Sequence, residues 1–598
     1  MPTQVLPITD IASLGVIEDT PSFSLPPNAF SDVQNVRFRD GAVRKMLGEE
    51  EFLTDDMRID FTNTPIRYSA YWPSPSGARY IVVTDIRMHV YNASGRQLAS
   101  ETVMDSSNWQ HTLFNGGFHI ILNGGVETPV YITDGGVDTE GVDNSVSIVA
   151  LPGWDSYAVE ETVSDFIYDG SMADFTIEDP RLVSGSSVRF EVTPRNISSP
   201  IRTTVLGIDS DGNLTPDGTV IGLGTASLSG TILTFTPVTD NGGASIRITV
   251  SSAPVTSVTA GVIRAYGNLL VAGNLREAGG RTLTGTVRTS DVAGPGEIPR
   301  NWNPFRLGVN TADEFTLSTT GTIQDLVELQ GNLYVYTDSS IHAIQQTGGP
   351  TIPFQITPVT DNYGVDNTGG VLEVDGKHIV VGSDDVYVFS GHPGSIQSIV
   401  DMRVRHADGF FRENSIQIVR FSRYDELWFW TPGNPLMYIW NYRNNTWTKR
   451  SQSTPVSGTE SPMGPLFNTD TQLYTVDSTS YTDLAGASYE AYVERLKMAL
   501  APEFDTEMLA SIAFLVSGNG QLNIQVVGSN NTGGVPPEFA IPNTRFKGGL
   551  FDIDTEYKQD IREHGRFLNY RMTHVPASSD IGFDMTGFQL DIGKGGTR

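Results

Sequence analysis

Two short acidic motifs are the first residues whose types and spacing could do chemistry. Asp209 and Asp211 stand two residues apart before Gly212, which is how a Ca²⁺ loop begins. The later ligands of such a loop are not recognisable, and a pair of Asx turns would give the same pattern. Asp384 and Asp385 could serve glycoside hydrolysis, which needs two carboxyls about 5–10 Å apart in a cleft. Because 69 acidic residues supply many such pairs by chance, we assign no catalytic residue.

Four tryptophans form the densest aromatic cluster of the chain: Trp428, Trp430, Trp440 and Trp447. Aromatic rings on a surface bind sugars or bases by stacking, so the cluster could mark a carbohydrate site. Trp428 and Trp430 lie in a strand-like run with Phe429 between them, so this run places aromatic rings on both sides of the strand. A core or a subunit interface would use the same residues.

Other sequence signatures of catalysis or cofactor binding are absent. The chain has no phosphate-binding Gly-x-x-x-x-Gly-Lys-Ser/Thr loop, no His-Glu-x-x-His and no Gly-x-Ser-x-Gly, and its nine histidines are scattered singly. With no cysteine, disulfides, thiolate metal sites and cysteine nucleophiles are excluded. We therefore predict that the protein is not an enzyme and has no cofactor and no metal site.

The charge balance excludes a general nucleic-acid binder. Asp and Glu number 69 against 39 Lys and Arg, which gives a net charge of −30. Nucleic-acid binders neutralise phosphates with clustered cations, whereas an acidic surface repels DNA and keeps a protein soluble. The sequence has no apolar run of about 18 residues and no cationic start before an apolar stretch, so we expect neither a transmembrane helix nor a signal peptide.

Short runs of β-branched and aromatic residues, bounded by Gly, Asn and Asp, dominate the chain. Such runs are typical of strands. One unit recurs, with a Gly turn, a hydrophobic strand, a polar turn and a second strand. Its copies begin near residues 267, 331, 375, 426 and 471, and the runs 79–85 and 118–124 could supply two more. A repeat of about 40–50 residues predicts a β-propeller, although meanders in sandwiches would look similar.

Two regions break this rhythm and define the predicted domains. Residues 155–258 contain 13 acidic residues, five arginines and no lysine, and their alternating strands fit an inserted immunoglobulin-like β-sandwich. From residue 487 the spacing of strands suggests a C-terminal β-sandwich. The predicted fold is therefore all-β, with an N-terminal hairpin and first blades in 1–154, the insert in 155–258, the remaining blades in 259–486 and the second sandwich in 487–598.

Two terminal segments carry a family resemblance. Residues 25–48 include Asn35-Val36-Arg37-Phe38, the hairpin turn Asp40-Gly41 and the basic pair Arg44-Lys45, and they resemble the opening of tail proteins of short-tailed bacteriophages. Residues 565–572 and 585–592 resemble the last strands of the same proteins, which include the nozzle or tail hub at the tip of the tail tube. The pair Met46-Leu47 departs from the family pattern, in which Arg-Pro or a similar pair is common.

The resemblance implies a structural virion protein of the tail. It would form a homohexameric ring below an adaptor ring, with a channel through which DNA leaves without specific binding. A plug protein or tail fibres would be further partners, and the insert could reach the host surface. The alternative is a carbohydrate-binding or carbohydrate-cleaving propeller, such as a lectin or glycosidase. The resemblance also implies a strand over residues 489–500, whereas Tyr489, Val493, Leu496 and Leu500 have helical spacing.

The N-terminal hairpin concentrates positive charge in an acidic protein. Its four cations are Arg37, Arg39, Arg44 and Lys45. We predict that they contact a neighbouring subunit or the adaptor ring, and a solvated hairpin is the competing interpretation.

Overall fold

Strands make up nearly all regular structure of the protein. The computed structural model describes residues 3–594 except for 53–63, 107, 123, 136–145, 155–159, 170–173, 196–199, 201, 216–218, 221–223, 239–242, 254–257, 278–281, 305–311, 320, 348–353, 413–414, 452, 477–478, 501–505, 532–538, 540–544 and 577–581. The helices in these residues are short 3-10 helices, η1 (Ser22–Ser24), η3 (Pro393–Ser395), η4 (Ala407–Arg412) and η5 (Ser422–Tyr424). None of the described helices is long and apolar enough to cross a membrane.

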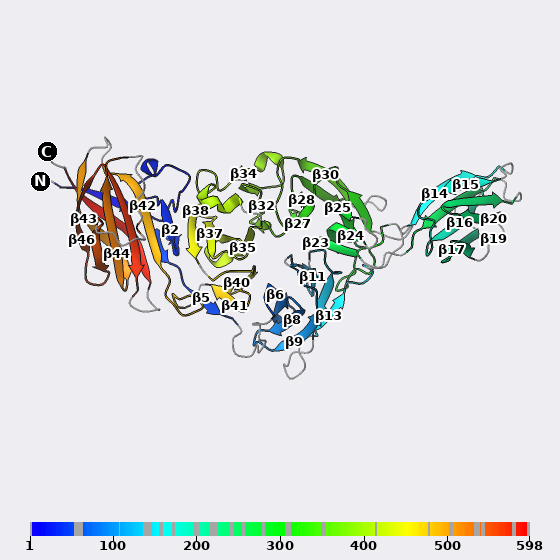
Figure 1. Cartoon of the computed structure of the whole chain (residues 1–598), viewed down its shortest axis with the longest axis horizontal. Helices are drawn as coiled ribbons and strands as arrows, with labels where there is room; N and C mark the ends of the chain where they lie inside the picture. The colour runs from blue at the N-terminus through cyan, green and yellow to red at the C-terminus, as the bar shows by residue number, and fades with distance from the viewer. Residues whose placement is uncertain are drawn as a thin grey trace.

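The body is a β-propeller whose described strands form seven four-stranded antiparallel sheets around one axis (Figure 1). The first strand of each blade lies nearest the axis. Its position is evident from its side chains, which line the central pocket described below. The strands are β6 (Ile66–Ser74), β7 (Gly77–Thr84), β8 (Arg87–Asn92) and β9 (Gln97–Thr102) in blade 1; β10 (Gln110–Phe114), β11 (Phe118–Leu122), β12 (Val130–Thr133) and β13 (Ser147–Ala150) in blade 2; β23 (Val258–Tyr266), β24 (Leu269–Glu277), β25 (Thr282–Thr289) and β26 (Asp313–Thr316) in blade 3; β27 (Ile323–Leu329), β28 (Asn332–Thr337), β29 (Ile341–Gln346) and β30 (Phe354–Thr360) in blade 4; β31 (Val371–Val374), β32 (Lys377–Val381), β33 (Val386–Phe389) and β34 (Gln397–Ser398) in blade 5; β35 (Gln417–Phe421), β36 (Glu426–Trp430), β37 (Leu436–Asn441) and β38 (Thr446–Ser451) in blade 6; β39 (Ser457–Ser461), β40 (Gly464–Asn468), β41 (Leu473–Val476) and β5 (Glu49–Glu51) in blade 7.

The last blade closes the propeller with a strand from the start of the chain. β5 pairs antiparallel with β41, so that Glu51 lies opposite Tyr474 and Glu49 opposite Val476. Because blade 7 takes its outer strand from ahead of blade 1, the ring of blades is held by backbone hydrogen bonds between distant parts of the sequence.

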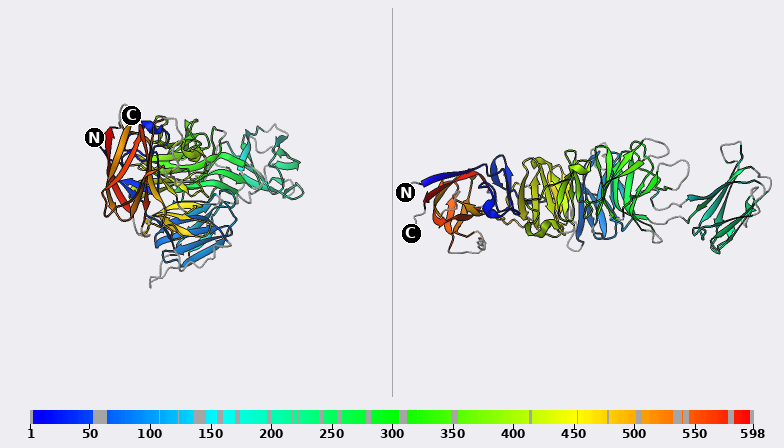
Figure 2. Two further views of the ribbon diagram at one scale, coloured as in Figure 1. Left: turned by 60° about the vertical axis from the view of Figure 1, so that its left-hand side comes forward. Right: turned by 90° about the horizontal axis from the view of Figure 1, so that it is seen from above.

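The segment between blades 2 and 3 folds as a separate two-sheet sandwich, hereafter the insert. Its inward side chains alternate along the strands, for example Val188, Phe190 and Val192 on β16, and pack into a core made only of insert residues. Figure 2 shows the insert standing clear of the blades. The sheet orders are β14-β22-β16-β17-β18 and β15-β21-β20-β19, with strands β14 (Glu160–Ile167), β15 (Phe175–Glu178), β16 (Ser187–Thr193), β17 (Arg202–Ile208), β18 (Leu214–Thr215), β19 (Thr219–Val220), β20 (Gly224–Ser229), β21 (Ile232–Pro237) and β22 (Ser245–Ser251).

The two ends of the chain together build the other sandwich, hereafter the terminal sandwich. One sheet runs β3-β4-β48-β43-β46 with β1 also on β48, and the other runs β2-β42-β47-β44-β45. Both chain ends lie at this sandwich in Figure 1. Its strands are β1 (Thr3–Thr9), β2 (Asp32–Gln34), β3 (Val36–Arg39), β4 (Ala42–Lys45), β42 (Ala491–Ala499), β43 (Glu507–Gly518), β44 (Gln521–Ser529), β45 (Lys547–Asp552), β46 (Lys558–Gly565), β47 (Phe567–Val575) and β48 (Phe583–Lys594).

This topology corrects the grouping of the N-terminal hairpin with the first blades in residues 1–154. The hairpin does form, with Arg39 opposite Ala42 and positive φ angles of 52° and 75° at Asp40 and Gly41. Its β4 strand, however, pairs with β48 through Val43 and Met585, more than 500 residues away in the sequence. The apolar side of the hairpin is thereby buried in the terminal sandwich rather than in a blade.

Residues 491–499 form a strand, as the resemblance implies, and not the helix that the local spacing suggests. β42 pairs with β2 on one side and with β47 on the other, so its backbone groups are satisfied only as an extended strand. A bulge between Arg495 and Met498 shifts the register, and Lys497 has a φ of 50° there. This bulge interrupts the two-residue alternation and so produces the misleading helical spacing.

The terminal sandwich shares its hydrophobic core with blades 5 and 6. Phe38, Val493 and Phe588 of the sandwich belong to the same buried cluster as Ile379 of blade 5 and Trp447 of blade 6. Separating the sandwich from the propeller would expose this apolar surface to water, so the two pack as one body.

Candidate functional site

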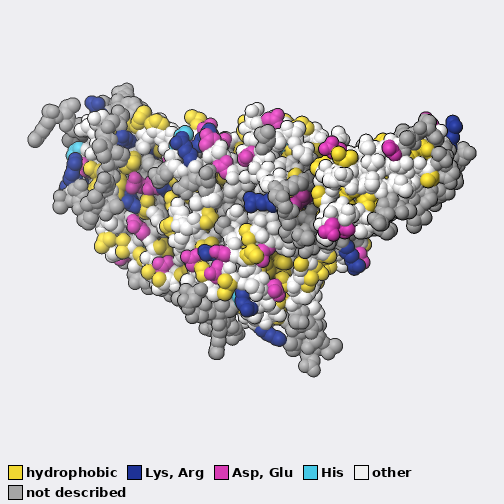
Figure 3. All heavy atoms as spheres, turned by 45° about the vertical axis from the view of Figure 1, so that its right-hand side comes forward, with side chains coloured by type: hydrophobic (Ala, Val, Ile, Leu, Met, Phe, Trp, Pro, Cys, Tyr) yellow, Lys and Arg dark blue, Asp and Glu magenta, His cyan; other side chains and the backbone are white. Residues whose placement is uncertain are grey.

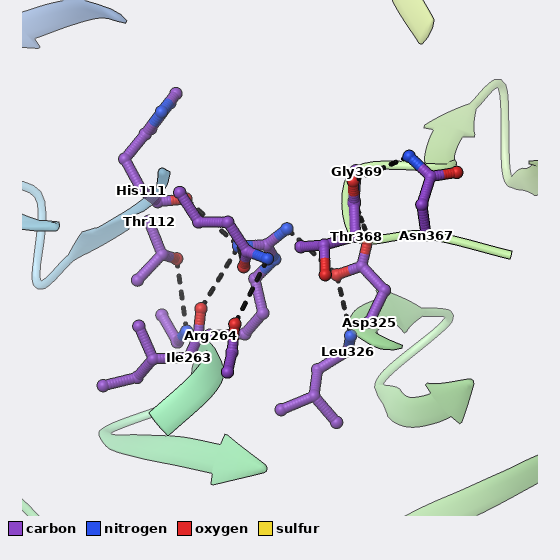
Figure 4. Close-up of polar contacts among 12 residues, drawn as sticks. His111, Thr112, Ile263, Arg264, Asp325, Leu326, Asn367, Thr368 and Gly369 are labelled. Carbon is purple, nitrogen blue, oxygen red and sulfur yellow. Dashed lines mark hydrogen bonds and ion pairs between the residues drawn. The ribbon is translucent and has the colours of Figure 1, made fainter. Parts of the chain in front are cut away.

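The first strands of the seven blades surround a pocket at the propeller axis. The pocket has a volume of about 740 Å³, and its lining combines aromatic rings, amides and charged groups: Tyr68, Tyr71, Trp109, Gln110, His111, Arg264, Glu373, Gln417, Arg420 and Glu460. These side chains come from six blades, and Thr368 and Gly369 of the segment before blade 5 complete the wall. Figure 4 shows the hydrogen-bonded centre of this lining.

An ion pair between blades 3 and 4 organises the pocket. Arg264 Nη2 lies 3.0 Å from Asp325 Oδ1, and Arg264 Nη1 donates to Gln110 Oε1 and to the His111 carbonyl of blade 2. Asp325 is fully buried, and burial raises the pKa of its carboxyl while the guanidinium opposes that shift. The pair therefore fixes three neighbouring blades relative to one another.

The segment that enters blade 5 is tied into the same network. Gly369 N donates to Asp325 Oδ2 at 3.2 Å, and Gln417 Nε2 of blade 6 donates to the Thr368 carbonyl at 3.1 Å. Gly369 has a φ of +81°, and a Cβ there would lie 2.6 Å from Gln417 Oε1. Hydrogen bonds therefore join the inner edges of blades 4, 5 and 6, and Figure 4 shows the contact between Asp325 and Gly369.

Beside this network, two histidines of blade 2 are held neutral. The Tyr68 hydroxyl lies 2.5 Å from His111 Nδ1, and the rings of His111 and His119 stand edge to face with centroids 4.7 Å apart. Burial, aided by Arg264, lowers the pKa of His111 to about 4, and burial also holds the pKa of His119 well below its ordinary value. Among the described residues, no group of three or more His, Cys, Asp or Glu side chains is placed to hold a metal ion.

The four predicted contact cations do not form one exposed patch. Arg37 is buried, with its Nε 2.6 Å and its Nη2 3.2 Å from the two carboxylate oxygens of Glu426 in blade 6. Its guanidinium also stacks 3.6 Å from the centre of the Tyr424 ring. Arg37 therefore fastens the terminal sandwich to the propeller within one subunit.

Lys45 is also internal, whereas the other two cations are half-exposed. The Lys45 ammonium lies 3.4 Å from Ser488 Oγ and faces the rings of Tyr481 and Tyr489, and burial lowers its pKa to about 8. On the same face of the hairpin as Arg37, the Arg39 guanidinium lies 3.4 Å from Asp40 and 4.9 Å from the centre of the Tyr424 ring. Arg44 lies 3.6 Å from Asp40 and 3.4 Å from Asp584. Arg39 and Arg44 are thus the two predicted cations that a neighbouring molecule could reach.

The tryptophan cluster is packed inside the protein. Trp428, Trp430 and Trp447 are at most 1% exposed and Trp440 is 7% exposed, and their neighbours are aromatic residues such as Phe467 and Phe411. These rings therefore contribute to the core of blade 6 and do not offer a stacking face.

The two acidic motifs make local structural contacts. Asp209 Oδ1 accepts hydrogen bonds from the backbone N–H groups of Asp211 and Asn213, which is the Asx-turn interpretation. Asp385 Oδ1 accepts from the Ser398 hydroxyl at 2.6 Å, and Asp384 pairs with Arg405 at 3.3 Å.

The pocket network has only a weak signature in the sequence. Arg264 and Asp325 are 61 residues apart on two ordinary-looking strands, and only the circular arrangement of the blades brings them together. A charged residue inside an otherwise apolar strand, such as Arg264 after Val262 and Ile263, is the one signal that could have pointed to them.

Comparisons with known proteins match this chain to solved structures but identify no family for it. No family model and no curated protein matches the chain. Among solved structures, Hsv2 of Kluyveromyces lactis is similar at 12% identity over 65% of this chain and 98% of that chain, with a TM-score of 0.25. The WD40 repeats of RRP9 align at 8% identity over 72% and 99%, with a TM-score of 0.30. Apo AztD from Citrobacter koseri aligns at 13% identity over 69% and 98%, with a TM-score of 0.24. Structural superposition adds little at such scores, and the assignment of a β-propeller follows from the topology of the blades.

Proposed function

We propose that the chain is a structural subunit of the nozzle, or hub, at the tip of a short bacteriophage tail. The observation that carries the proposal concerns the two terminal segments that resemble this family. They are separated by more than 500 residues, yet β3 and β4 join β48 in one sheet of the terminal sandwich. The resemblance at the two ends therefore corresponds to a single structural unit, and an accidental match at either end would not require this.

In this proposal six copies form a ring, and DNA passes between the subunits during ejection. The conduit in this proposal is the channel enclosed by the ring, and the axis of each propeller is a separate pocket lined by Arg264, Thr368 and Gly369. The net charge of −30 per subunit would keep DNA from adhering to the channel wall. On the face drawn in Figure 3, acidic and basic side chains are interspersed, so the proposed repulsion relies on the summed charge of the ring.

The proposed contacts with partner proteins are assigned to parts of the molecule that are exposed or project from the propeller. The half-exposed Arg39 and Arg44 would meet the acidic surface of the adaptor ring or of a neighbouring subunit. The insert projects from the propeller away from the terminal sandwich (Figure 1), where it could contact fibres, a plug protein or the host surface. This role involves no catalysis and no cofactor.

The test is the assembly state of the purified full chain, alone and mixed with tail particles that lack their tip. Mass photometry should detect a species of about 390 kDa, six copies of the 65.0 kDa chain, and negative-stain images should show rings. Replacing 155–257 by a short linker should leave the rings intact, because Trp154 Nε1 donates to the Val258 carbonyl at 2.7 Å and so holds the ends of the insert together. Monomers under both conditions would contradict the proposal, as would turnover of a saccharide.

A further inference from the structure

A cluster of buried charges lies where the terminal sandwich meets blade 6. It contains three carboxylates and two cations, contributed by the N-terminal segment, blade 6 and the sheet of the sandwich that carries β42: Glu18, Asp32, Glu494, Lys449 and Arg571. Four of these side chains are at most 15% exposed, and Asp32 is 30% exposed. With every group ionised, the cluster has one negative charge more than its cations can balance.

Of the three carboxylates in the cluster, Glu494 has the weakest ion pairing. In the sheet it lies directly opposite Asp32 of β2 on one side and directly opposite Arg571 of β47 on the other. Like charges in opposite cross-strand positions repel. The ion pair that Glu494 makes with the described residues is long, with Arg571 Nη1 3.9 Å from its carboxylate.

The other charged groups of the cluster, and the hydroxyls beside it, bind partners other than Glu494. Lys449 Nζ lies 2.7 Å from Glu18 Oε1 and forms a second ion pair with Asp32. The Tyr492 hydroxyl donates to Asp32 Oδ2 at 2.8 Å, and the Tyr438 hydroxyl donates to Glu18 Oε2 at 3.1 Å.

Arg571 is also shared. It stacks 3.5 Å from the centre of the Tyr492 ring, and its Nη2 lies 3.6 Å from the half-exposed Glu490. The guanidinium is therefore divided between two carboxylates and one aromatic ring, and neither carboxylate receives a close hydrogen bond from it.

We propose that this cluster is a proton-operated joint, in which a proton on Glu494 fastens the terminal sandwich to the propeller and its release loosens their contact. A neutral Glu494 removes the repulsion across β2 and β42 and can donate a hydrogen bond to Asp32. The carboxylates and cations are then equal in number, and the interface loses its unbalanced charge. The inference goes beyond the proposed function and does not depend on ring formation.

The direction of the pH effect follows from burial. Burial, with Asp32 in addition, raises the pKa of Glu494 to about 7, against the opposing effects of Arg571 and Lys449. Burial raises the pKa of Glu18 as well. A raised carboxyl pKa means that the state in which Glu494 is buried beside Asp32 binds the proton more tightly than a state in which Glu494 reaches water. The joint is therefore most stable below the ordinary carboxyl pKa and weakens as pH rises towards about 7.

Hydrogen exchange of the full-length protein tests the joint. Peptides covering β2 and β42 should lose at least about tenfold in protection, corrected for intrinsic exchange, between about pH 5.5 and pH 8.5. Glu494→Gln imitates the protonated side chain and should remain protected across this range. The matched control is Glu490→Gln, which removes a carboxylate paired with the same arginine but should keep the pH response. Peptides from the insert core should not respond.

A second variant makes the inference specific to the repulsion between the two carboxylates. Asp32→Asn removes the charge opposite Glu494, so the midpoint of the response should move to lower pH. An unchanged pH response in Glu494→Gln would overturn the proposal. So would a wild-type protein whose β2 and β42 peptides show no pH dependence, or an Asp32→Asn variant whose midpoint stays in place.

Discussion

The molecule contains two β-sandwiches that differ in how they are joined to the propeller. The insert is one continuous stretch of chain, and the described side chains of its core, such as Phe190 and Phe235, are all its own. The terminal sandwich is assembled from both ends of the chain, and its core continues into blades 5 and 6. The two sandwiches therefore have a similar architecture but differ in their relation to the propeller. The insert is a separate module, whereas the terminal sandwich is part of the body.

The ion pairs of the two sandwiches follow the same division. In the insert, Arg247 pairs with Asp165 at 2.8 Å, with both side chains more than 40% exposed. At the terminal sandwich, Arg37 and Glu426 pair across the joint with 8% and 2% of their side chains exposed. A buried pair loses far more than an exposed pair when one partner is removed, so the joint should respond strongly to single substitutions.

The largest effect is expected from Glu426→Ala. This substitution leaves the Arg37 guanidinium buried without its carboxylate and removes the acceptor of the Trp428 indole N–H. We expect the unfolding free energy of the propeller and terminal sandwich to fall by about 4 kcal/mol. Differential scanning calorimetry should show that transition move to lower temperature while the transition of the insert stays in place.

The control for this prediction replaces both partners. Arg37→Met together with Glu426→Leu removes the pair without leaving a buried charge, so most of the lost stability should return. A loss below about 1 kcal/mol in Glu426→Ala would mean that the pair behaves as an exposed one.

The second effect, Phe190→Ala, tests the independence of the insert. Phe190 is fully buried and packs against Phe235 with ring centroids 5.0 Å apart. Truncation leaves a cavity, and we expect a loss of about 3 kcal/mol confined to the insert. Limited proteolysis should then cut within 160–251 while the propeller remains protected. Simultaneous loss of the propeller would show that the insert is not a separate folding unit.

The same comparison explains how much of the fold the sequence could predict. The blades are predictable because their strands, apart from β5 in blade 7, form local meanders, such as Asn332–Thr337 followed by Ile341–Gln346, with turn signals in between. The insert is predictable because it is one continuous stretch whose strands alternate buried and exposed residues, as β16 does, although its outer strand β14 pairs with the distant β22. The terminal sandwich is not, because β4 finds β48 only through tertiary packing, and no local pattern encodes that choice.

The site residues were harder to predict for the same reason. The concentration of cations in the hairpin suggested a contact surface, but Arg37 finds Glu426 across 389 residues, and Lys45 turns towards Tyr481 and Tyr489. Charge in a sequence indicates neither burial nor partner, and those two properties decide whether a cation binds a neighbour or fastens its own domain.

The smallest effect compares Lys45, a buried cation that pairs with no carboxylate among the described residues, with an exposed ion pair. Lys45 has a pKa lowered to about 8 by burial, so its folded state binds the proton less tightly than the unfolded chain. Wild-type stability therefore rises as pH increases from about 8 towards the ordinary lysine pKa, and below that window the buried charge is destabilising. Lys45→Met should raise the unfolding free energy by about 1 kcal/mol at neutral pH, and this gain should vanish near pH 10 as measured by urea denaturation.

Arg247→Met in the insert, which breaks an exposed pair, should change stability by less than about 0.5 kcal/mol at any pH. Lys449→Met, which removes a cation held by two carboxylates, should instead destabilise the protein. A destabilised Lys45→Met would mean that the tyrosine rings and Ser488 compensate the buried ammonium fully, and the terminal sandwich would then tolerate isolated charge as readily as the insert does.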